Sequence, residues 1–389
     1  MATFDSSSSA GSGSPAKAPV AVRGRGAVAN VVHRFDVDTR DVVDDGWGQD
    51  PATDQIGAHR TTTEVEQART LISRNTSPDI PFVAAINPYR GCEHGCVYCY
   101  ARPTHAYLGY SPGLDFETRL VAKQNAVEAL TQEFAKPGYR VTPINVGSAT
   151  DVYQPIEREW ALTRGLLQLM RSTGHPLTLV TKNALVERDL DVLTALAKDN
   201  LVAVYVSITS MDNVLSSKLE PRASAPWRRL RAVRVLADAG VPVGVLVAPV
   251  IPFITDEHLE HVLAAAREAG AHYASYTVLR LPYEVKDIFE TWLRVHYPDR
   301  ADRVLHRIED MRGGRRNDPR FGSRMRGTGL WADLLRQRFN LAARRLGFER
   351  ERLPLNCDLF VPPLAQRPRG AGGTSLSATS NTVQFGLFD

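Results

Sequence analysis

Three of the four cysteines in this 389-residue chain fall within eight positions. Residues 92–99 read CEHGCVYC, so Cys92, Cys96 and Cys99 lie on one short loop. Three neighbouring thiolates can each bind one iron of a cubane iron–sulfur cluster, and the fourth iron then has no protein ligand. An iron with an open position can bind the amino and carboxylate groups of a small molecule, as an open catalytic zinc keeps a place for water. The loop therefore indicates a cluster that takes part in chemistry.

The alternative for this loop is a single zinc ion held by the three cysteines and His94. Zinc motifs usually consist of two well-separated ligand pairs, and His94 lies too close in sequence to Cys92 and Cys96 to complete a tetrahedron comfortably. Four cysteines are also too few for a disulfide framework in a chain of this length. We therefore expect metal binding in a reducing compartment.

Around the cysteine loop, short runs of β-branched residues alternate with longer helical patterns. The expected strands are 82–87, 143–148, 177–182, 201–208, 241–249 and 272–279. The helices expected between them are 116–134, 157–173, 188–198, 226–239 and 255–269. Strands separated by helices pair in parallel through right-handed crossovers, so the pattern predicts an α/β fold, either an open doubly wound sheet or an arc of a β/α barrel. In both cases ligands bind at the carboxyl ends of the strands.

The regions outside this alternation differ in composition. Both ends are rich in serine, glycine, alanine and proline, which favours disorder. Helical patterns follow the last strand at 286–297, 301–311 and 331–346. The expected organisation is a disordered tail over 1–26, an acidic extension over 27–78, the β/α region over 79–282, an Arg-rich helical extension over 283–365 and a flexible tail over 366–389.

The net charge of +4 is unevenly distributed along the chain. Residues 300–352 hold fifteen arginines, no lysine and seven acids, whereas residues 35–67 hold two arginines and nine acids. Arginine without lysine favours bidentate recognition of phosphate, and residues 311–326 add a phenylalanine, Phe321, that could stack on a base. The alternative is that these arginines are the solvated faces of ordinary helices.

No segment predicts a membrane location. The most apolar run, Val241–Ile251, is too short to span a bilayer and contains two prolines. The first residues lack the basic and apolar segments of a secretory signal. We therefore expect a cytoplasmic protein.

The CxxxCxxC spacing, with an aromatic residue before the last cysteine and a strand before the loop, resembles the radical S-adenosylmethionine (SAM) superfamily. Residues 87–281 are similar, more narrowly, to its spore photoproduct lyase-like branch. The matching stretches are NPYRGCEHGCVYCY (87–100), DFETRLVAKQN (115–125), ATDVYQPIE (149–157), VTKN (180–183), VSIT (206–209), LEPR (219–222) and LVAPVIP (246–252). The resemblance implies a partial (β/α)6 barrel of parallel strands.

The resemblance also implies two cofactors, a 4Fe–4S cluster on Cys92, Cys96 and Cys99, and SAM. Reduced by a flavodoxin or ferredoxin-type donor, the cluster would cleave SAM and generate a 5′-deoxyadenosyl radical that abstracts hydrogen from a substrate. The implied SAM contacts are a cation for the methionine carboxylate at Lys182, hydroxyls at Thr150 and Ser207, a small residue under the adenine at Ala248 and an aromatic ring at Tyr98. The alternatives are a solvated lysine, simple turn bonding and buried strand positions.

The chain departs from the family at one catalytic position. The lyases that repair thymine dimers carry a cysteine just before the hydroxyl of the second strand, where it returns a hydrogen to the product radical, but residues 147–150 read GSAT here. Ser148 and Ala149 cannot replace a thiol, because their O–H and C–H bonds are too strong. Cys357 is the only other thiol and could act only if the C-terminal segment folds over the barrel mouth; a small buried side chain is the alternative.

The C-terminal sequence QFGLF (384–388) resembles the peptide by which bacterial DNA repair and replication proteins bind the sliding clamp. Gln384 would bond at the pocket edge and Leu387 and Phe388 would be the apolar anchors; a chance match is the alternative. Together with the arginines, this peptide predicts a radical SAM enzyme acting on nucleic acid, DNA more than RNA, in lyase-like repair of photoproducts. The alternatives are radical modification of tRNA or of a protein side chain, and a non-catalytic, clamp-associated iron–sulfur scaffold.

Overall fold

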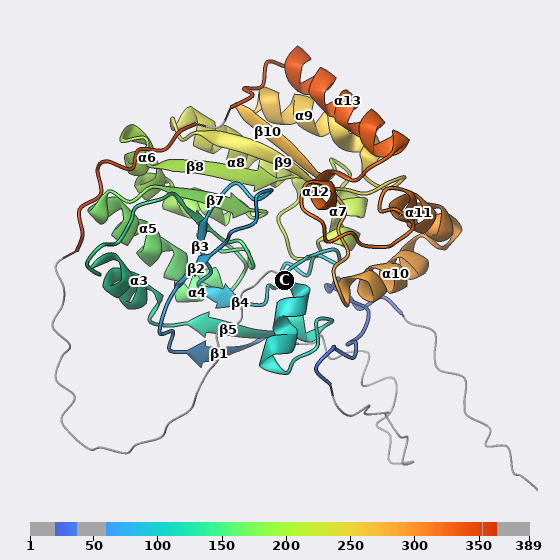
Figure 1. Cartoon of the computed structure of the whole chain (residues 1–389), viewed down its shortest axis with the longest axis horizontal. Helices are drawn as coiled ribbons and strands as arrows, with labels where there is room; N and C mark the ends of the chain where they lie inside the picture. Colours follow the sequence, from blue (N-terminus) through green and yellow to red (C-terminus); the bar gives the residue numbers. More distant parts are fainter. Residues whose placement is uncertain (1–19, 37–59, 352, 364–389) are drawn as a thin grey trace, which may run out of the picture.

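The computed structural model describes residues 20–36, 60–351 and 353–363 (Figure 1). The QFGLF peptide, residues 1–19 of the N-terminal tail and residues 37–59 of the acidic extension lie outside these ranges. The clamp-binding role of Gln384, Leu387 and Phe388 therefore stays a prediction.

The main element is a seven-stranded sheet with the order β10-β9-β8-β7-β6-β3-β2. Its strands are β2 Ile72–Arg74, β3 Ala84–Ile86, β6 Ile144–Val146, β7 Leu177–Thr181, β8 Val202–Ser207, β9 Val243–Val250 and β10 Tyr273–Val278. From β3 to β10 each strand pairs in parallel with the next one along the chain, and β2 adds an antiparallel edge. A doubly wound sheet would reverse its strand order at a switch point. The observed order is that of a six-stranded arc of a β/α barrel, so the structure decides between the two expected architectures.

Helices cover the outer face of this arc (Figure 1). They are α3 Ala126–Phe134, α5 Leu162–Thr173, α6 Leu190–Lys198, α8 Pro226–Asp238 and α9 Leu259–Glu268. Their buried apolar side chains and those of the strands form one continuous core. On the inner face the strands approach closely, because a Cβ at Gly244 would lie 2.8 Å from ring carbons of Tyr205. Glycine therefore allows the Tyr205 ring to pack across the inside of the arc.

The helix expected over 116–134 is wrong, because the chain forms α2 Asp115–Thr118, then β5 Arg119–Lys123, and only then α3. The segment RLVAK places Leu120 and Ala122 in buried positions. It pairs with β1 Thr62–Glu66 in parallel and with β4 Tyr89–Arg90 in antiparallel. This second sheet, β1-β5-β4, lies beside the cysteine loop, and it joins residues 60–78 of the expected acidic extension to the barrel (Figure 1).

Three other expected helices are divided. The 157–173 pattern forms α4 Glu157–Trp160 and α5, separated at Ala161 with a φ of 49°. The 188–198 pattern begins with the 3-10 helix η2 Ala184–Asp189, and the 255–269 pattern with η3 Asp256–His258. The structure also forms α7 Asn213–Leu219 after β8, which we did not expect.

The Arg-rich extension is helical where predicted, in α10 Val285–His296, α11 Pro298–Asp310 and α13 Leu330–Arg345. The short helix α12 Ser323–Arg326 was not expected. The Arg-rich extension packs on the barrel rather than extending away from it. Arg338 of α13 pairs with Glu260 of α9 at 2.7 Å, and α12 lies against β10 near the carboxyl ends of the strands (Figure 1). Within the described ranges, no helix has the length and apolarity needed to cross a bilayer.

Candidate active site

The cysteine loop runs between β4 and the 3-10 helix η1 Arg102–Leu108, at the carboxyl end of β3. Cys92 and Cys96 are buried, and Cys99 is half-buried. Gly95 has a φ of 64°, and a Cβ there would lie 2.6 Å from Oε2 of Glu117. Glycine therefore gives the loop both its left-handed turn and its close contact with α2.

A buried arginine holds the loop in place. Arg102 has no exposed surface and donates to the carbonyls of Cys96 at 2.9 Å and Gly95 at 3.1 Å. Its charge is balanced by Glu117, which is also fully buried. Because these bonds fix the backbone on both sides of Cys96, the cysteine positions are set by protein contacts.

The three thiols fit a cubane better than a single metal ion. Burial, and the charges of the other two cysteines among further groups, raise the pKa of Cys92, and burial also raises the pKa of Cys96 and Cys99. Among the residues that the structure describes, no three His, Cys, Asp or Glu side chains converge closely enough to hold one metal ion. A cubane needs its thiolates further apart than one ion does, since each binds a different iron.

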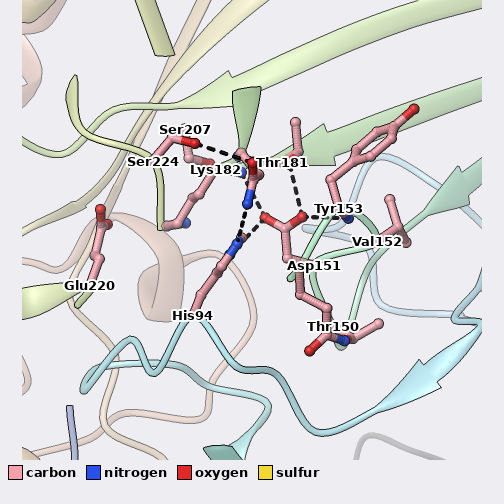
Figure 2. Close-up of polar contacts among 12 residues, drawn as sticks. His94, Thr150, Asp151, Val152, Tyr153, Thr181, Lys182, Ser207, Glu220 and Ser224 are labelled. Carbon is pink, nitrogen blue, oxygen red and sulfur yellow. Dashed lines mark hydrogen bonds and ion pairs between the residues drawn. The ribbon is translucent and has the colours of Figure 1, made fainter. Parts of the chain in front are cut away.

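His94 is engaged elsewhere, which argues against the zinc alternative. Its Nε2 faces Nδ2 of Asn183 at 3.0 Å, and its Nδ1 lies 3.2 Å from a carboxylate oxygen of Asp151 (Figure 2). Oδ1 of Asn183 accepts from the backbone N–H of Leu185, so the amide must present its NH₂ to His94. Nε2 is then an acceptor and the imidazole proton is on Nδ1, facing Asp151.

Asp151 connects the cysteine loop to the ends of two strands, a role that the sequence analysis missed. Its carboxylate accepts from the backbone N–H of Lys182 at 2.7 Å and of Tyr153 at 2.9 Å, and from Oγ1 of Thr181 at 2.8 Å (Figure 2). Burial opposes ionisation, but His94 and these donors outweigh it and lower the pKa of Asp151 to about 2. The only sequence signal was its place in the ATDVYQPIE stretch.

Lys182 follows β7 at the carboxyl end of the barrel (Figure 2). Its Nζ lies 5.9 Å from the ring centre of Tyr98, and its charge acts on both Cys96 and Glu220. Among the described residues Nζ has no ion-pair partner. A backbone fixed by Asp151 and an ammonium group unpaired among the described residues suit the binding of a ligand carboxylate. That Lys182 binds the carboxylate of SAM stays a prediction.

Tyr98 is buried, and its hydroxyl donates to Glu220, which is paired with Arg229. Arg229 also donates to the carbonyls of Ser207 at 3.0 Å and Ser224 at 2.6 Å. Burial and Glu220 hold the pKa of Tyr98 well above its usual value. The polar end of Tyr98 is therefore used inside the protein, and only its ring is left for contact with a ligand.

The remaining expected SAM contacts lie on the same side of the barrel but differ in environment. Thr150 is buried, and its Oγ1 donates to the carbonyl of Gly91 at 2.7 Å and accepts from Gln154 at 2.9 Å. It therefore braces the cysteine loop. Ser207 ends β8, and Ala248 lies near the end of β9. Their contacts with SAM remain predictions.

The structure does not bring Cys357 to the site. Asn356 bonds to the carbonyl of Asn200, which precedes β8, so Cys357 lies at the amino ends of the strands. Phe360 then packs on His175 and Phe134, further along the same side. A hydrogen-donor role for Cys357 is contradicted in this conformation. Ser148, whose hydroxyl accepts a hydrogen bond from Asn87, carries no thiol. Among the described residues, the only cysteines at the mouth are therefore the three of the cysteine loop.

The sequence of this region also matches a known protein family. Residues 86–266 match the family model described as Radical SAM superfamily. The chain therefore carries a radical SAM domain, the domain of a superfamily of enzymes that use a 4Fe–4S cluster and SAM.

Within that class the fold resembles spore photoproduct lyase. A variant of that enzyme superposes with a TM-score of 0.54, at 18% identity, over 75% of this chain and 82% of that chain. An uncharacterized protein of Mycobacterium tuberculosis (strain ATCC 25618 / H37Rv) is 37% identical over 226 residues, 58% of this chain and 66% of that protein. One of Methanocaldococcus jannaschii is 26% identical over 60% of this chain and 83% of that protein. The chain thus spans just under two thirds of the mycobacterial relative's length.

Proposed function

We propose that this protein is a radical SAM enzyme that acts on nucleic acid, with DNA photoproducts as the substrate class and a lyase-like reaction. The observation that carries the proposal is the position of the Arg-rich extension, whose helix α12 packs at the open end of the barrel beside β10. The lyase-like fold supports the same reading. The electron donor, the sliding clamp and the cytoplasmic location remain part of this proposal.

When bound, the cluster and SAM together supply one-electron, hydrogen-abstracting chemistry. Cys92, Cys96 and Cys99 would hold the cluster in a loop packed against Phe116 and Ala149, which exclude water from the sulfurs. The Lys182 ammonium would bind the methionine carboxylate. The reaction differs from that of a lyase with a cysteine before Thr150, because the hydrogen that ends the reaction must come from another donor.

The chemistry is tested by anaerobic reconstitution of Cys96→Ala beside Cys357→Ala. We expect Cys96→Ala to lose the visible charge-transfer absorption of thiolate-bound iron and the formation of 5′-deoxyadenosine from SAM. Cys357→Ala should keep both, since Cys357 lies at the other end of the barrel. A Cys96→Ala protein that still cleaves SAM, or wild-type protein that contains only zinc, would contradict the assignment.

The substrate class is tested by salt-dependent binding to DNA and RNA oligonucleotides of equal length, and by incubation with ultraviolet-damaged DNA, dithionite and SAM. We expect tighter binding to DNA and the appearance of repaired bases. Tighter binding to RNA would point to tRNA modification, and indifference to both would point to a protein target. SAM turnover in any of these cases would exclude a purely structural cluster.

A further inference from the structure

Arg280 is a half-buried cation at the barrel mouth, and no carboxylate of the described residues balances its charge. It follows β10, and its Nη1 lies 3.5 Å from the sulfur of Met325 in α12. Its guanidinium lies 5.9 Å from the ring centre of Tyr100, the residue after the last cluster cysteine. Its Nε is buried without a hydrogen-bond partner. No carboxylate of the described residues forms an ion pair with it.

The buried arginines of the described chain are more completely paired. Arg102 pairs with Glu117, Arg229 with Glu220 and Arg324 with Asp79. Arg312 also lacks a carboxylate, and its Nε is likewise without a partner, but its terminal nitrogens donate to three backbone carbonyls, those of Leu279, Ser323 and Arg324. A guanidinium that is removed from water without an anion is costly, so such a group usually marks a site where a ligand supplies the missing charge.

The surroundings of Arg280 favour an anion. Burial and the neighbouring charge of Arg324 lower the pKa of Arg280, and Asp79, the nearby acid, is already paired with Arg324. Arg326 of α12 is exposed on the same side, stacked 4.7 Å from the ring centre of Tyr276 in β10. The planar guanidinium group of arginine can donate two parallel hydrogen bonds to a phosphate, so a phosphate suits this position better than a simple counter-ion does.

The rim next to Arg280 also carries exposed aromatic rings. Tyr100 is 48% exposed, Tyr107 of η1 is 56% exposed and Tyr283, three residues after Arg280, is 52% exposed. Arg34 joins the last two, with its guanidinium 5.3 Å from the Tyr107 ring centre and 4.2 Å from that of Tyr283. Exposed rings interleaved with arginines are typical of surfaces that bind unpaired nucleic-acid strands, where bases stack and phosphates pair.

We propose that Arg280 binds a backbone phosphate of a nucleic-acid strand and so holds one nucleotide beside Tyr100, next to the cluster loop. This inference deepens the proposed function and depends on it, since it assigns the phosphate subsite of the same active site. Arg280 is a binding residue, and the substrate phosphate completes its pairing.

The test is fluorescence anisotropy of a labelled single-stranded DNA oligonucleotide with the full-length, reconstituted protein over a series of salt concentrations. We expect Arg280→Gln to bind about tenfold more weakly and to lower the slope of log K against log salt by about 0.7, the value for one phosphate contact on a single strand. Arg280→Lys should keep most of the slope. The matched control is Arg171→Gln, an exposed arginine near the end of α5 on the outer face of the barrel, which should behave as wild type.

A second readout separates this inference from the proposed function. Arg280→Gln should keep the wild-type visible absorption of the reconstituted cluster, which shows that the variant folds and that its cysteine loop is intact. If wild-type protein binds the oligonucleotide and Arg280→Gln has the same affinity and salt slope, the assignment of Arg280 is overturned while the proposed function stands. If inorganic phosphate alone raises the melting temperature of wild type but not of Arg280→Gln, and oligonucleotide binding is unaffected, the site binds free phosphate instead. If wild type binds no nucleic acid, both proposals fall.

Discussion

The two sides of the barrel mouth differ in whether their charged side chains have partners within the protein. On the side of the cysteine loop, Asp151 is surrounded by donors and the pair of Glu220 and Arg229 is completed by Tyr98. On the side of β10 and α12, Arg280 is half-buried, and no carboxylate of the described residues pairs with it. On the first side, the buried charged groups already have partners within the protein. Lys182 is the exception, because its ammonium group has no ion-pair partner among the described residues. On the second side, we expect a ligand to supply the anion that pairs with Arg280.

The difference suits the two ligands that such a site must hold. A cofactor that is split in the same geometry in every cycle requires fixed contacts, because small displacements reduce the rate strongly. A polymeric substrate must arrive and leave, so its contacts can remain unsatisfied between cycles. We therefore expect substitutions on the first side to reduce stability and those on the second side to reduce binding alone.

The largest effect is expected for Arg229→Met. This change leaves the fully buried Glu220 carboxylate without its cation and frees the carbonyls of Ser207 and Ser224. Removing one partner of a buried pair costs about 3–5 kcal/mol of unfolding free energy. Urea unfolding under anaerobic conditions measures it.

The matched control for this pair is the double variant Glu220→Gln/Arg229→Met, which removes both charges. It should recover most of the lost stability, because a neutral buried residue does not require a counter-ion. Equal stability of wild type and Arg229→Met would show that the two sides of the mouth do not differ as described.

A smaller effect is expected for Asp151→Asn, a loss of about 2 kcal/mol of unfolding free energy. The amide still accepts some of the hydrogen bonds but lacks the negative charge that faces His94. The pKa of Asp151 in the folded protein, about 2, is below its ordinary value of 3.8. Its contribution is therefore fully present above about pH 4 and is lost as the pH falls towards 2. The difference in unfolding free energy between the two proteins should be constant from pH 8 to pH 5 and should shrink below about pH 4. A difference that grows on acidification would contradict the contacts assigned to the Asp151 carboxylate.

The smallest effect on stability is expected for Arg280→Met. Because Arg280 lacks an anion, an apolar side chain of similar length should leave the unfolding free energy within about 0.5 kcal/mol of wild type, or raise it. Thermal unfolding without nucleic acid checks this. A loss of about 2 kcal/mol or more would show that Arg280 is a structural residue and would remove the contrast between the two sides.

Much of the fold was predictable because its strands are short apolar runs between helical patterns. The six parallel strands of the arc all fall inside the expected ranges or within one residue of them, and α10, α11 and α13 of the Arg-rich extension lie close to the ranges that their periodicity predicted. The main error, β5, arose because Phe116–Phe134 is apolar enough at helical spacing to read as one helix. Pairing with β1, more than fifty residues earlier, decided its conformation, and no local pattern reveals such a partner.

The parts of the site that consist of residues close together in the sequence were predictable. The parts that consist of residues brought together from distant segments were not. The three cysteines share one loop, so their spacing alone indicated a cluster. His94, Asp151 and Asn183 come from three loops, and each one alone has an ordinary polar role. The predicted hydrogen-donor role of Cys357 was wrong for a related reason. The path of the C-terminal segment depends on the packing of Phe360 against Phe134 and His175, and the sequence near Cys357 does not reveal this packing.

By itself, the amino-acid sequence determined the class of chemistry and the alternation of strands and helices, because both depend on residues that are close along the chain. Only the tertiary structure decided that the sheet is an arc, that His94 contacts Asp151 and Asn183, and that Cys357 lies away from the mouth. It also decided that Arg280 lies near Tyr100 without an ion-pair partner among the described residues. These outcomes depend on burial and on pairing between distant segments, and the energy of a charge is set by which groups the fold brings within a few ångströms of it.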